Sequence, residues 1–351
     1  MKQIYGSSRT GDLKTAVSGI SNPAFLILMS NEKQFEEHVA QLEAIFPGVP
    51  SIGAIGISYG AQVCDNGVGV VGFTGVAAVA NVLEEVSTMP AKYISRIEQD
   101  LKTIHAEKGN TVCIDLCTGN DACVLTTIDT VLGKAGIQLM GGTGDQGKVS
   151  CNGKIYTDAD AYALVKNQGG RVKVYKENVY KPMEQDYRFI ASNTDRSKYY
   201  MGKLNGKPAK KVYMEALGIP EKAIGDQTMK NPFGKMIGND ICIISIKEVV
   251  GDGLACFRQV NDSDVLTLLE LRDYKEVVQD TTDRIHADFN KISAVFSLNC
   301  VFRYLLFVNN GVFDDYLKRM GALGSHCGYV GYGEHNCNQF INQSMTCVVF
   351  E

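Results

Sequence analysis

The sequence has 351 residues, 45% of them apolar and 21% charged, which is enough apolar surface for one large core or two moderate ones. A net charge of −4, with no clustered Lys or Arg, excludes the basic surface that nucleic-acid binding requires. No membrane insertion is expected, because residues 66–83, the one uncharged stretch long enough to span, have the Val/Gly alternation of two strands.

The N-terminal residues and the cysteine content predict a cytoplasmic location. The sequence after Met1 runs into polar residues without the apolar core of a secretion signal. The chain contains eleven cysteines, an odd number, which favours reduced thiols over a disulfide framework.

The first strong elements are a buried strand and an amphipathic helix. Residues 24–29 are almost continuously apolar, which is typical of a strand buried on both faces. Asn31 can cap a helix with Gln34 at its third position. The apolar stripe of that helix, which ends before Pro47, consists of Phe35, Val39, Leu42 and Ile45.

Further along the chain, Pro90 begins a second predicted helix and Asp121 opens a third. Asn152-Gly153 predicts a hairpin turn in a more polar meander. A turn-rich segment near residues 167–170 predicts a domain boundary, giving domains 1–168 and 169–351. In the later domain we expect a short helix between Pro208 and Gly218, strands between residues 241 and 269, and a helix over 273–288, whereas residues 181–207 lack convincing periodicity.

One pattern occurs three times: an apolar strand, a helix, a Gly-rich strand, a turn and a second apolar strand. The copies pair residues 24–29, 51–56 and 67–73; residues 111–116, 136–142 and 159–165; and residues 293–297, 328–333 and 346–350. Each copy places a polar loop between its first strand and its helix, so strand ends and helix starts are expected to converge on ligand-binding clefts. The predicted fold class is therefore α/β (α+β), with mixed sheets covered by helices and built from repeated β-α-β-β units.

Residues 297–303 are the most informative candidate for ligand binding. If a strand ends there and a helix begins, Cys300 lies near unpaired backbone N–H groups, the positive end of the helix dipole and Arg303. That environment attracts a carboxylate or phosphate and favours a thiolate. The alternative is that Asn299 caps the helix, Cys300 packs in the core and Arg303 pairs with a surface acid. The predicted ligand contacts here are Ser297, Asn299, Cys300 and Arg303.

The polar loop between the last two predicted strands is a second candidate. Glu334 can hold an ammonium group while Asn342 and Thr346 supply hydrogen bonds, although the same residues can satisfy the backbone of an ordinary loop. The predicted contacts of this loop are Tyr332, Gly333, Glu334, Asn342 and Thr346.

The Gly-rich residues 141–147 are a third candidate. They lack the GK[ST] ending of a phosphate-binding loop and lead into strands, so no nucleotide loop is expected. They can form a pocket wall or a plain turn, and we include Gly141, Gly142 and Asp145 among the predicted contacts. Residues 115–121 could line the equivalent cleft of the second repeat, although helix capping alone would explain Asn120 and Asp121.

No metal site is predicted. Two adjacent strand residues face opposite ways, so a set made of His326, Cys327, His335 and Cys337 cannot easily share an ion, and its spacing matches no zinc module. Cys113 and Cys117 would lie about 13 Å apart along a strand, so a structural role is expected for them.

These motifs, in this order, resemble the FIST domain family, a two-part intracellular sensory module of bacterial signalling proteins and some F-box proteins. The N-terminal part is matched by residues 51–54, 139–145 and 152–153, and the C-terminal part by residues 208–218, 231–234, 297–303 and 332–334 with Thr346. Residues 55–58 depart from the family's usual small-residue and Gly-Glu pattern.

The resemblance implies a FIST N-terminal-like domain over 1–168 and a FIST C-terminal-like domain over 169–351. It implies a non-enzymatic sensory protein that binds a small ligand, with an amino acid or similar polar metabolite suggested, and that signals through a separate partner protein. Two alternatives remain: a thiol enzyme acting through Cys300, and a haem-binding nitric oxide sensor like some relatives. No His falls on a transferable motif position, so the expectation is that no cofactor is bound.

Overall fold

The computed structural model describes residues 1–238 and 240–351. The predicted α/β class is confirmed, with 29% helix and 42% strand. The chain forms two compact units, the first of Met1–Glu177, Val278–Phe340 and Ser344–Glu351, and the second of Asn178–Val277 and Ile341–Gln343. Residues 169–351 are thus divided between both units, and their assignment to a FIST C-terminal-like domain stays a prediction.

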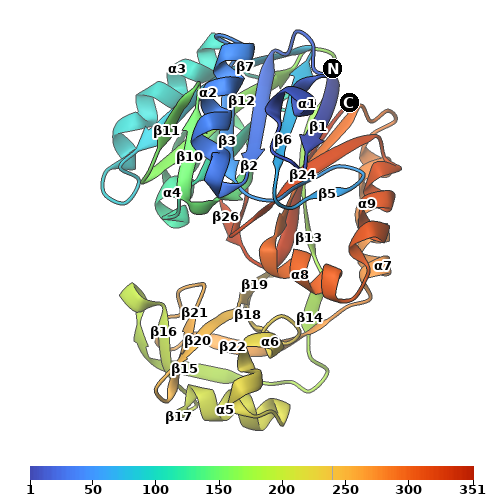
Figure 1. The fold of residues 1–351 in the computed structure, drawn as a ribbon. Helices are drawn as coiled ribbons and strands as arrows, with labels where there is room; N and C mark the ends of the chain where they lie inside the picture. The colour runs from blue at the N-terminus through green and yellow to red at the C-terminus, as the bar shows by residue number, and fades with distance from the viewer. Residues whose placement is uncertain (239) are drawn as a thin grey trace. The chain divides into compact units, whose positions relative to one another are not determined.

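The first unit contains three six-stranded sheets in the described chain, and all three have an equivalent strand order. Figure 1 shows strands β6, β2 and β3 of the first sheet side by side. The first sheet is ordered β1 (Lys2–Ser8), β6 (Val68–Thr74), β2 (Phe25–Ser30), β3 (Ser51–Ile55), β10 (Asp145–Cys151) and β11 (Lys154–Tyr156). The second is ordered β7 (Val76–Glu84), β12 (Ala159–Asn167), β8 (Thr111–Cys117), β9 (Gln138–Thr143), β25 (Glu334–Asn336) and β26 (Gln339–Ile341). The third is ordered β13 (Val172–Asn178), β27 (Ser344–Phe350), β23 (Ala294–Cys300), β24 (Ser325–Gly331), β4 (Ser58–Tyr59) and β5 (Val63–Cys64).

The predicted threefold repeat is visible in the strand pairing. In each repeat the first strand pairs in parallel with the second, as β2 does with β3, β8 with β9 and β23 with β24. The third strand returns antiparallel to the first, as β6, β12 and β27 do. The uncharged residues 66–83 contain β6 and most of β7, as the Val/Gly alternation predicts.

The hairpin within each repeat extends the sheet of a different repeat. Strand β4 of the first repeat pairs with β24, β10 of the second pairs with β3, and β25 of the third pairs with β9. We call this arrangement the hairpin exchange. Because each sheet ends in a hairpin from another repeat, the three repeats are interlocked and form one unit.

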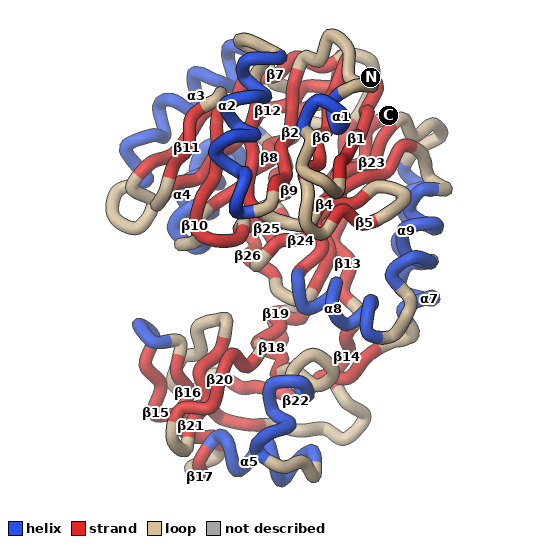
Figure 2. The backbone as a smooth tube through the Cα atoms, viewed as in Figure 1, coloured by secondary structure: helices blue, strands red, loops and turns tan. Residues whose placement is uncertain are grey.

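Helices cover the outer faces of these sheets, and strands fill the interior of the unit (Figure 2). The helices of the first unit are α1 (Leu13–Val17), α2 (Phe35–Ile45), α3 (Ile94–Thr103), α4 (Asp121–Ala135), α8 (Val301–Asn309) and α9 (Phe313–Gly321), while α7 (Tyr274–Asp288) runs across the boundary of the two units. Asn31 caps the 3₁₀ turn η1 (Glu32–Gln34) ahead of α2, and Pro90 opens η2 (Pro90–Tyr93) ahead of α3, as predicted. Of the predicted stripe on α2, Phe35, Val39 and Leu42 are buried, but Ile45 is exposed.

Inward-facing apolar side chains of all three sheets pack into one core. Members from each sheet include Phe73, Leu116 and Phe296, all fully buried. The opposite face of the second sheet packs against α3 and α4 in a separate cluster around Cys113, Ile128 and Tyr162. Buried on both sides, these strands leave little room for polar residues, so the polar side chains inside this unit need specific partners.

The second unit consists of one nine-stranded sheet, built from described residues on both sides of position 239, with helices α5 (Ala209–Leu217) and α6 (Ile224–Gln227) and the 3₁₀ turns η3 (Arg196–Lys198) and η4 (Glu221–Ala223). Its strands are β14 (Tyr180–Pro182), β15 (Phe189–Asp195), β16 (Tyr200–Leu204), β17 (Lys207–Pro208), β18 (Phe233–Ile237), β19 (Asp240–Ile244), β20 (Ile246–Val250), β21 (Gly253–Cys256) and β22 (Val265–Leu271). The helix predicted between Pro208 and Gly218 is confirmed as α5, with Gly218 in the left-handed conformation at its end. The strands within 181–207 were not predicted.

Candidate functional site

Two of the predicted ligand segments lie side by side. Strands β9 and β25 pair so that Glu334 lies opposite Gly142 and His335 lies opposite Gly141. The Tyr332 hydroxyl, on a side chain that is 47% exposed, donates to Asp145 Oδ2 over 3.1 Å. The Gly-rich segment and the C-terminal polar loop, predicted as separate candidates, therefore form one continuous polar region.

The two glycines of this region allow close approach of the chains. The φ of Gly142 is 153°, and a Cβ there would collide with the carbonyl oxygen of Gly333. A Cβ at Gly141 would collide with the carboxyl group and the backbone of Asp115. Residues larger than glycine would push β25 away from β9.

Glu334 is fully buried and lies at the centre of this region. Its Oε2 accepts a hydrogen bond of 2.9 Å from Ser344 Oγ, while Oε1 accepts none from the part of the chain that the structure describes. Burial raises the pKa of Glu334 to about 8, although hydrogen bonds from Ser344 and Cys300 partly oppose the shift. Glu334 thus combines a buried carboxyl group with an acceptor that is open to a donor.

Cys300 ends β23 and occupies the N-cap position of α8. It is 5% exposed, and its side chain makes no capping hydrogen bond to the helix. The alternative in which Asn299 caps this helix is wrong, because Asn299 lies within β23 and its amide contacts Tyr59 and Tyr316. The start of α8 therefore keeps backbone N–H groups that no N-cap side chain satisfies.

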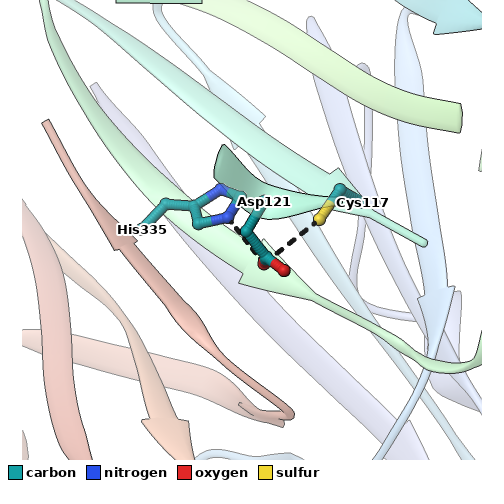
Figure 3. Close-up of side chains that lie close together, drawn as sticks. All are labelled: Cys117, Asp121 and His335. Atoms are coloured by element: carbon teal, nitrogen blue, oxygen red, sulfur yellow. Dashed lines mark hydrogen bonds and ion pairs between the residues drawn. The ribbon is translucent and has the colours of Figure 1, made fainter. Parts of the chain in front are cut away.

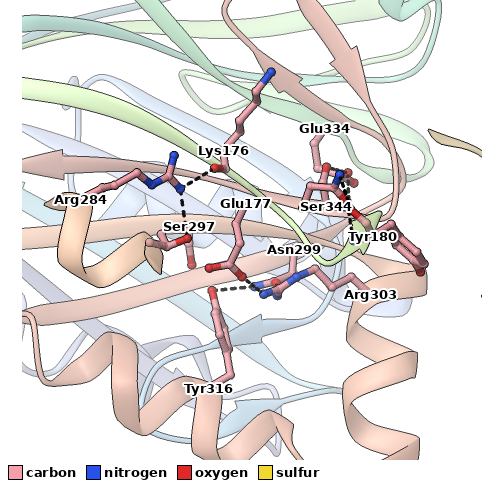
Figure 4. A network of polar contacts seen from close by, with 12 residues as sticks. Lys176, Glu177, Tyr180, Arg284, Ser297, Asn299, Arg303, Tyr316, Glu334 and Ser344 are labelled. Atoms are coloured by element: carbon pink, nitrogen blue, oxygen red, sulfur yellow. Dashed lines mark hydrogen bonds and ion pairs between the residues drawn. The ribbon is translucent and has the colours of Figure 1, made fainter. Parts of the chain in front are cut away.

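Arg303 does not take the surface position that was one of its two predicted alternatives. Its guanidinium forms an ion pair with Glu177, and both side chains are fully buried (Figure 4). It also donates to Asn299 Oδ1, and its Cζ lies 4.2 Å and 4.8 Å from the ring centroids of Phe307 and Tyr316. Arg303 is thus committed to an interior network of charges and aromatic rings.

The same network continues to Ser297. Its hydroxyl contacts Tyr59 Oη at 2.9 Å and His326 Nε2 at 2.8 Å. Burial lowers the pKa of His326 to about 3, so this imidazole is neutral at physiological pH. Ser297, Asn299 and Arg303 are therefore brought together, as predicted, but in a fully buried network rather than at an open cleft.

The remaining predicted contacts, Thr346 and Asn342, lie in different units. Thr346 is fully buried in β27 and accepts from Asn336 Nδ2 at 3.1 Å. Asn342 belongs to the second unit and is 6% exposed, and its Nδ2 has no hydrogen-bond partner among the described residues.

Sequence reasoning gave too little weight to a second polar cluster, made of Cys117, Asp121 and His335 (Figure 3). Asp121 Oδ1 lies 2.9 Å from His335 Nε2 and accepts from Thr143 Oγ1 at 2.5 Å. Cys117 Sγ lies 3.7 Å from the same oxygen. One ligand-type atom from each of the three residues falls within 4.8 Å of the other two. Capping does not explain the polar residues here, because Asn120 makes no side-chain capping hydrogen bond and Asp121 is directed at His335.

Two more buried carboxyl groups adjoin this cluster. His335 Nδ1 lies 2.5 Å from Asp115 Oδ2, so the imidazole bridges Asp115 and Asp121. Burial works against a charged imidazole, yet the Asp115 and Asp121 carboxylates raise the pKa of His335 well above its ordinary value. Burial and the neighbouring Asp115 also raise the pKa of Asp160 well above its ordinary value. Protonated Asp160 can then donate to Asp115.

The thiol of Cys117 is not activated in this environment. Burial, followed by the Asp121 charge, raises its pKa to about 12.

The three repeats place polar contacts at matching points, since the end of the first strand contacts the following helix in each: Ser30 with His38, Cys117 with Asp121, and Asn299 with Arg303. Of these three contacts, the one between Cys117 and Asp121 also includes His335, which comes from the hairpin of another repeat.

A comparison with known protein families identifies the family of this chain. The family model described as the FIST N domain matches residues 24–207, slightly more than half of the chain. No curated protein matches the sequence. Among the described residues, no helix is long and apolar enough to cross a membrane. The chain therefore belongs to the FIST family, whose domains are sensory modules of signal transduction.

Proposed function

We propose that this protein is a receptor for a small polar metabolite with a protonated amino group, such as an amino acid, and that it signals through a separate partner protein. The observation that carries the proposal is the buried carboxyl group of Glu334, whose Oε1 has no donor in the described residues. A buried acceptor without a donor is costly, and a ligand ammonium group supplies the missing hydrogen bond and a matching charge.

The start of α8 supports an amino acid rather than a simple amine. Cys300 hydrogen-bonds to Glu334 and is the N-cap residue of α8, so the carboxyl group contacts the residue that precedes the first N–H groups of that nine-residue helix. These groups suit an anion, because their hydrogens point out of the helix and the helix dipole adds positive potential. A carboxylate there and an ammonium group on Glu334 together fit the two charged ends of an amino acid.

The same arrangement supports a binding role rather than catalysis. Arg303, the cation that could have held the ligand carboxylate, is paired with Glu177. Cys300 is almost fully buried, and its thiol is engaged in a hydrogen bond with the Glu334 carboxyl group. No disulfide joins the cysteines in the described residues, in keeping with the proposed cytoplasmic location.

The proposal is tested by thermal-shift and calorimetric titration of the full chain with the individual amino acids and their decarboxylated amines. An amino acid is expected to raise the melting temperature, and its amine to bind more weakly because the contact at α8 is lost. Glu334→Gln keeps the shape of the side chain but cannot ionise to pair with a ligand ammonium group, and is expected to reduce binding by at least about tenfold.

Ser344→Ala removes the hydroxyl that holds Glu334 Oε2, and is expected to weaken binding less. Ser30→Ala is the matched control, because it removes a buried hydroxyl that contacts His38 in the first repeat. If amino acids bind Glu334→Gln as tightly as the unaltered protein, the proposed site is incorrect. Binding of amines alone would restrict the ligand class to cations.

A further inference from the structure

We propose that Cys117, Asp121 and His335 form a binding site for a divalent transition-metal ion of the zinc class. This inference is independent of the amino-acid site. Glu334 and His335 are neighbours in β25, and successive residues of a strand point to opposite faces of the sheet. Glu334 contacts Ser344, whereas His335 contacts Asp115 and Asp121 near the start of α4.

The backbone brings the three side chains together from three elements. Cys117 is the last residue of β8, and Asp121 is the first residue of α4, after a sharp turn in which Asn120 has a φ of 58°. His335 arrives by the hairpin exchange and lies opposite Gly141. Strand pairing and helix packing thus fix the positions of all three groups without a ligand, so the site is preorganised.

The donor set suits zinc better than magnesium or calcium. A thiolate sulfur, an imidazole nitrogen and a carboxylate oxygen are all common zinc ligands, whereas magnesium and calcium prefer oxygen alone. Three protein ligands leave a fourth tetrahedral position for water or for Thr143, whose hydroxyl is 3.3 Å from Cys117 Sγ and 2.5 Å from Asp121 Oδ1.

The surroundings of His335 provide a second and independent observation. Metal-bound histidines usually donate their other ring N–H to a carboxylate, and here Nδ1 lies 2.5 Å from Asp115 Oδ2, which leaves Nε2 facing Asp121 and Cys117. Asp115 Oδ1 and both carboxyl oxygens of Asp160 are fully buried and accept no hydrogen bond from described residues. Three carboxyl groups thus lie around one imidazole, and two of them, Asp115 and Asp121, are close enough to its ring nitrogens to balance the charge of a bound divalent cation.

Access to the site is through Asp121. Its side chain is 18% exposed, while those of His335 and Asp115 are fully buried. An ion can therefore meet Asp121 first and displace the proton that Nε2 shares with this carboxylate.

The test is a titration of tag-free, chelator-treated full-length protein with Co²⁺, followed by displacement with Zn²⁺. We expect one Co²⁺ per chain, a thiolate-to-cobalt charge-transfer band in the near ultraviolet, and visible bands typical of four-coordinate cobalt. Cys117→Ser is expected to lose the charge-transfer band, whereas Cys113→Ser, a matched change of a fully buried cysteine in the same strand, is expected to keep it. Asp115→Asn is expected to weaken binding by about 10–100-fold.

The proposal is overturned if the unaltered protein gives no thiolate band, or if the band survives in Cys117→Ser. It is also overturned if Asp121→Asn and His335→Gln both bind Co²⁺ as tightly as the unaltered protein. Should a variant fail to fold, X-ray absorption of the zinc-loaded unaltered protein decides the matter: one sulfur in the coordination shell supports the site, and a shell of nitrogen and oxygen alone contradicts it.

Discussion

The buried ion pair between Arg303 and Glu177 gives the sharpest quantitative prediction. Replacing Arg303 with Met keeps the length of the side chain but leaves the Glu177 carboxylate buried without its partner, in a site where both side chains are fully buried. Loss of one partner from such a pair costs about 3–5 kcal/mol of unfolding free energy, since the remaining charge is neither solvated nor paired. Removing both charges in Arg303→Met/Glu177→Leu is expected to recover most of this loss, because the desolvation cost then disappears as well.

The assay is urea unfolding at neutral pH, followed by far-ultraviolet circular dichroism because the chain contains no tryptophan. The two single variants and the double variant form a cycle whose coupling energy is expected to exceed about 2 kcal/mol. Arg319→Met, which breaks the partly exposed pair with Asp315, is the control and is expected to cost less than about 1 kcal/mol. Additive effects of the two single substitutions, or a cost for Arg303→Met no larger than that of the control, would refute the reasoning.

Three further predictions concern a histidine, a glycine and the cysteines. Because the pKa of His326 falls to about 3 in the folded protein, the unfolded chain binds more protons below pH 6.5, so the unfolding free energy should fall by up to about 4–5 kcal/mol as the pH drops from 6.5 to 3. In urea titrations across this range His326→Gln should lose less stability, and parallel curves would count against the assignment. Gly328→Ala should lower the unfolding free energy by about 1–3 kcal/mol or more, because the added Cβ would collide with the Ser297 carbonyl oxygen and the Tyr59 hydroxyl. Gly321→Ala is the control and should be nearly neutral, because no atom beyond its own stretch of helix lies within 4 Å of the added Cβ. Equal urea midpoints for the two variants would contradict this prediction. In native protein a thiol reagent should modify the exposed Cys123 first and the buried Cys300 only on unfolding, and rapid modification of Cys300 would instead favour the thiol-enzyme alternative.

Much of the first unit could be predicted from the sequence because its strands are unusually regular. Strand β2 is buried along its whole length, so an uninterrupted apolar run identifies it. Strand β15 behaves differently, because exposed and half-buried positions interrupt its apolar residues and the strand has no clear period. It is held by pairing with β16 and β22, a tertiary effect that local sequence does not carry.

The candidate site could be predicted only in part, because some of its residues are marked by local sequence and others depend on partners far away in the chain. Glu334, Gly142 and Cys300 could be selected because each lies in a polar or Gly-rich segment at a strand end. The role of His335 depends on β25 joining the sheet of another repeat, and that of Arg303 on Glu177, which lies 126 positions away in the sequence. For the cluster of Cys117, Asp121 and His335, the available signal in the sequence was the polar stretch from Asp115 to Asp121. Helix capping offered an adequate local explanation for that stretch.

The hairpin exchange also constrains how this protein is made. Strand β4 (Ser58–Tyr59) is synthesised well before its partner β24 (Ser325–Gly331). Until β24 is synthesised, β4 lacks the strand with which it pairs, and the third sheet cannot be completed. The native strand pairing can therefore form only after β24 has been synthesised, and pairing between strands so far apart in the sequence is intrinsically slow.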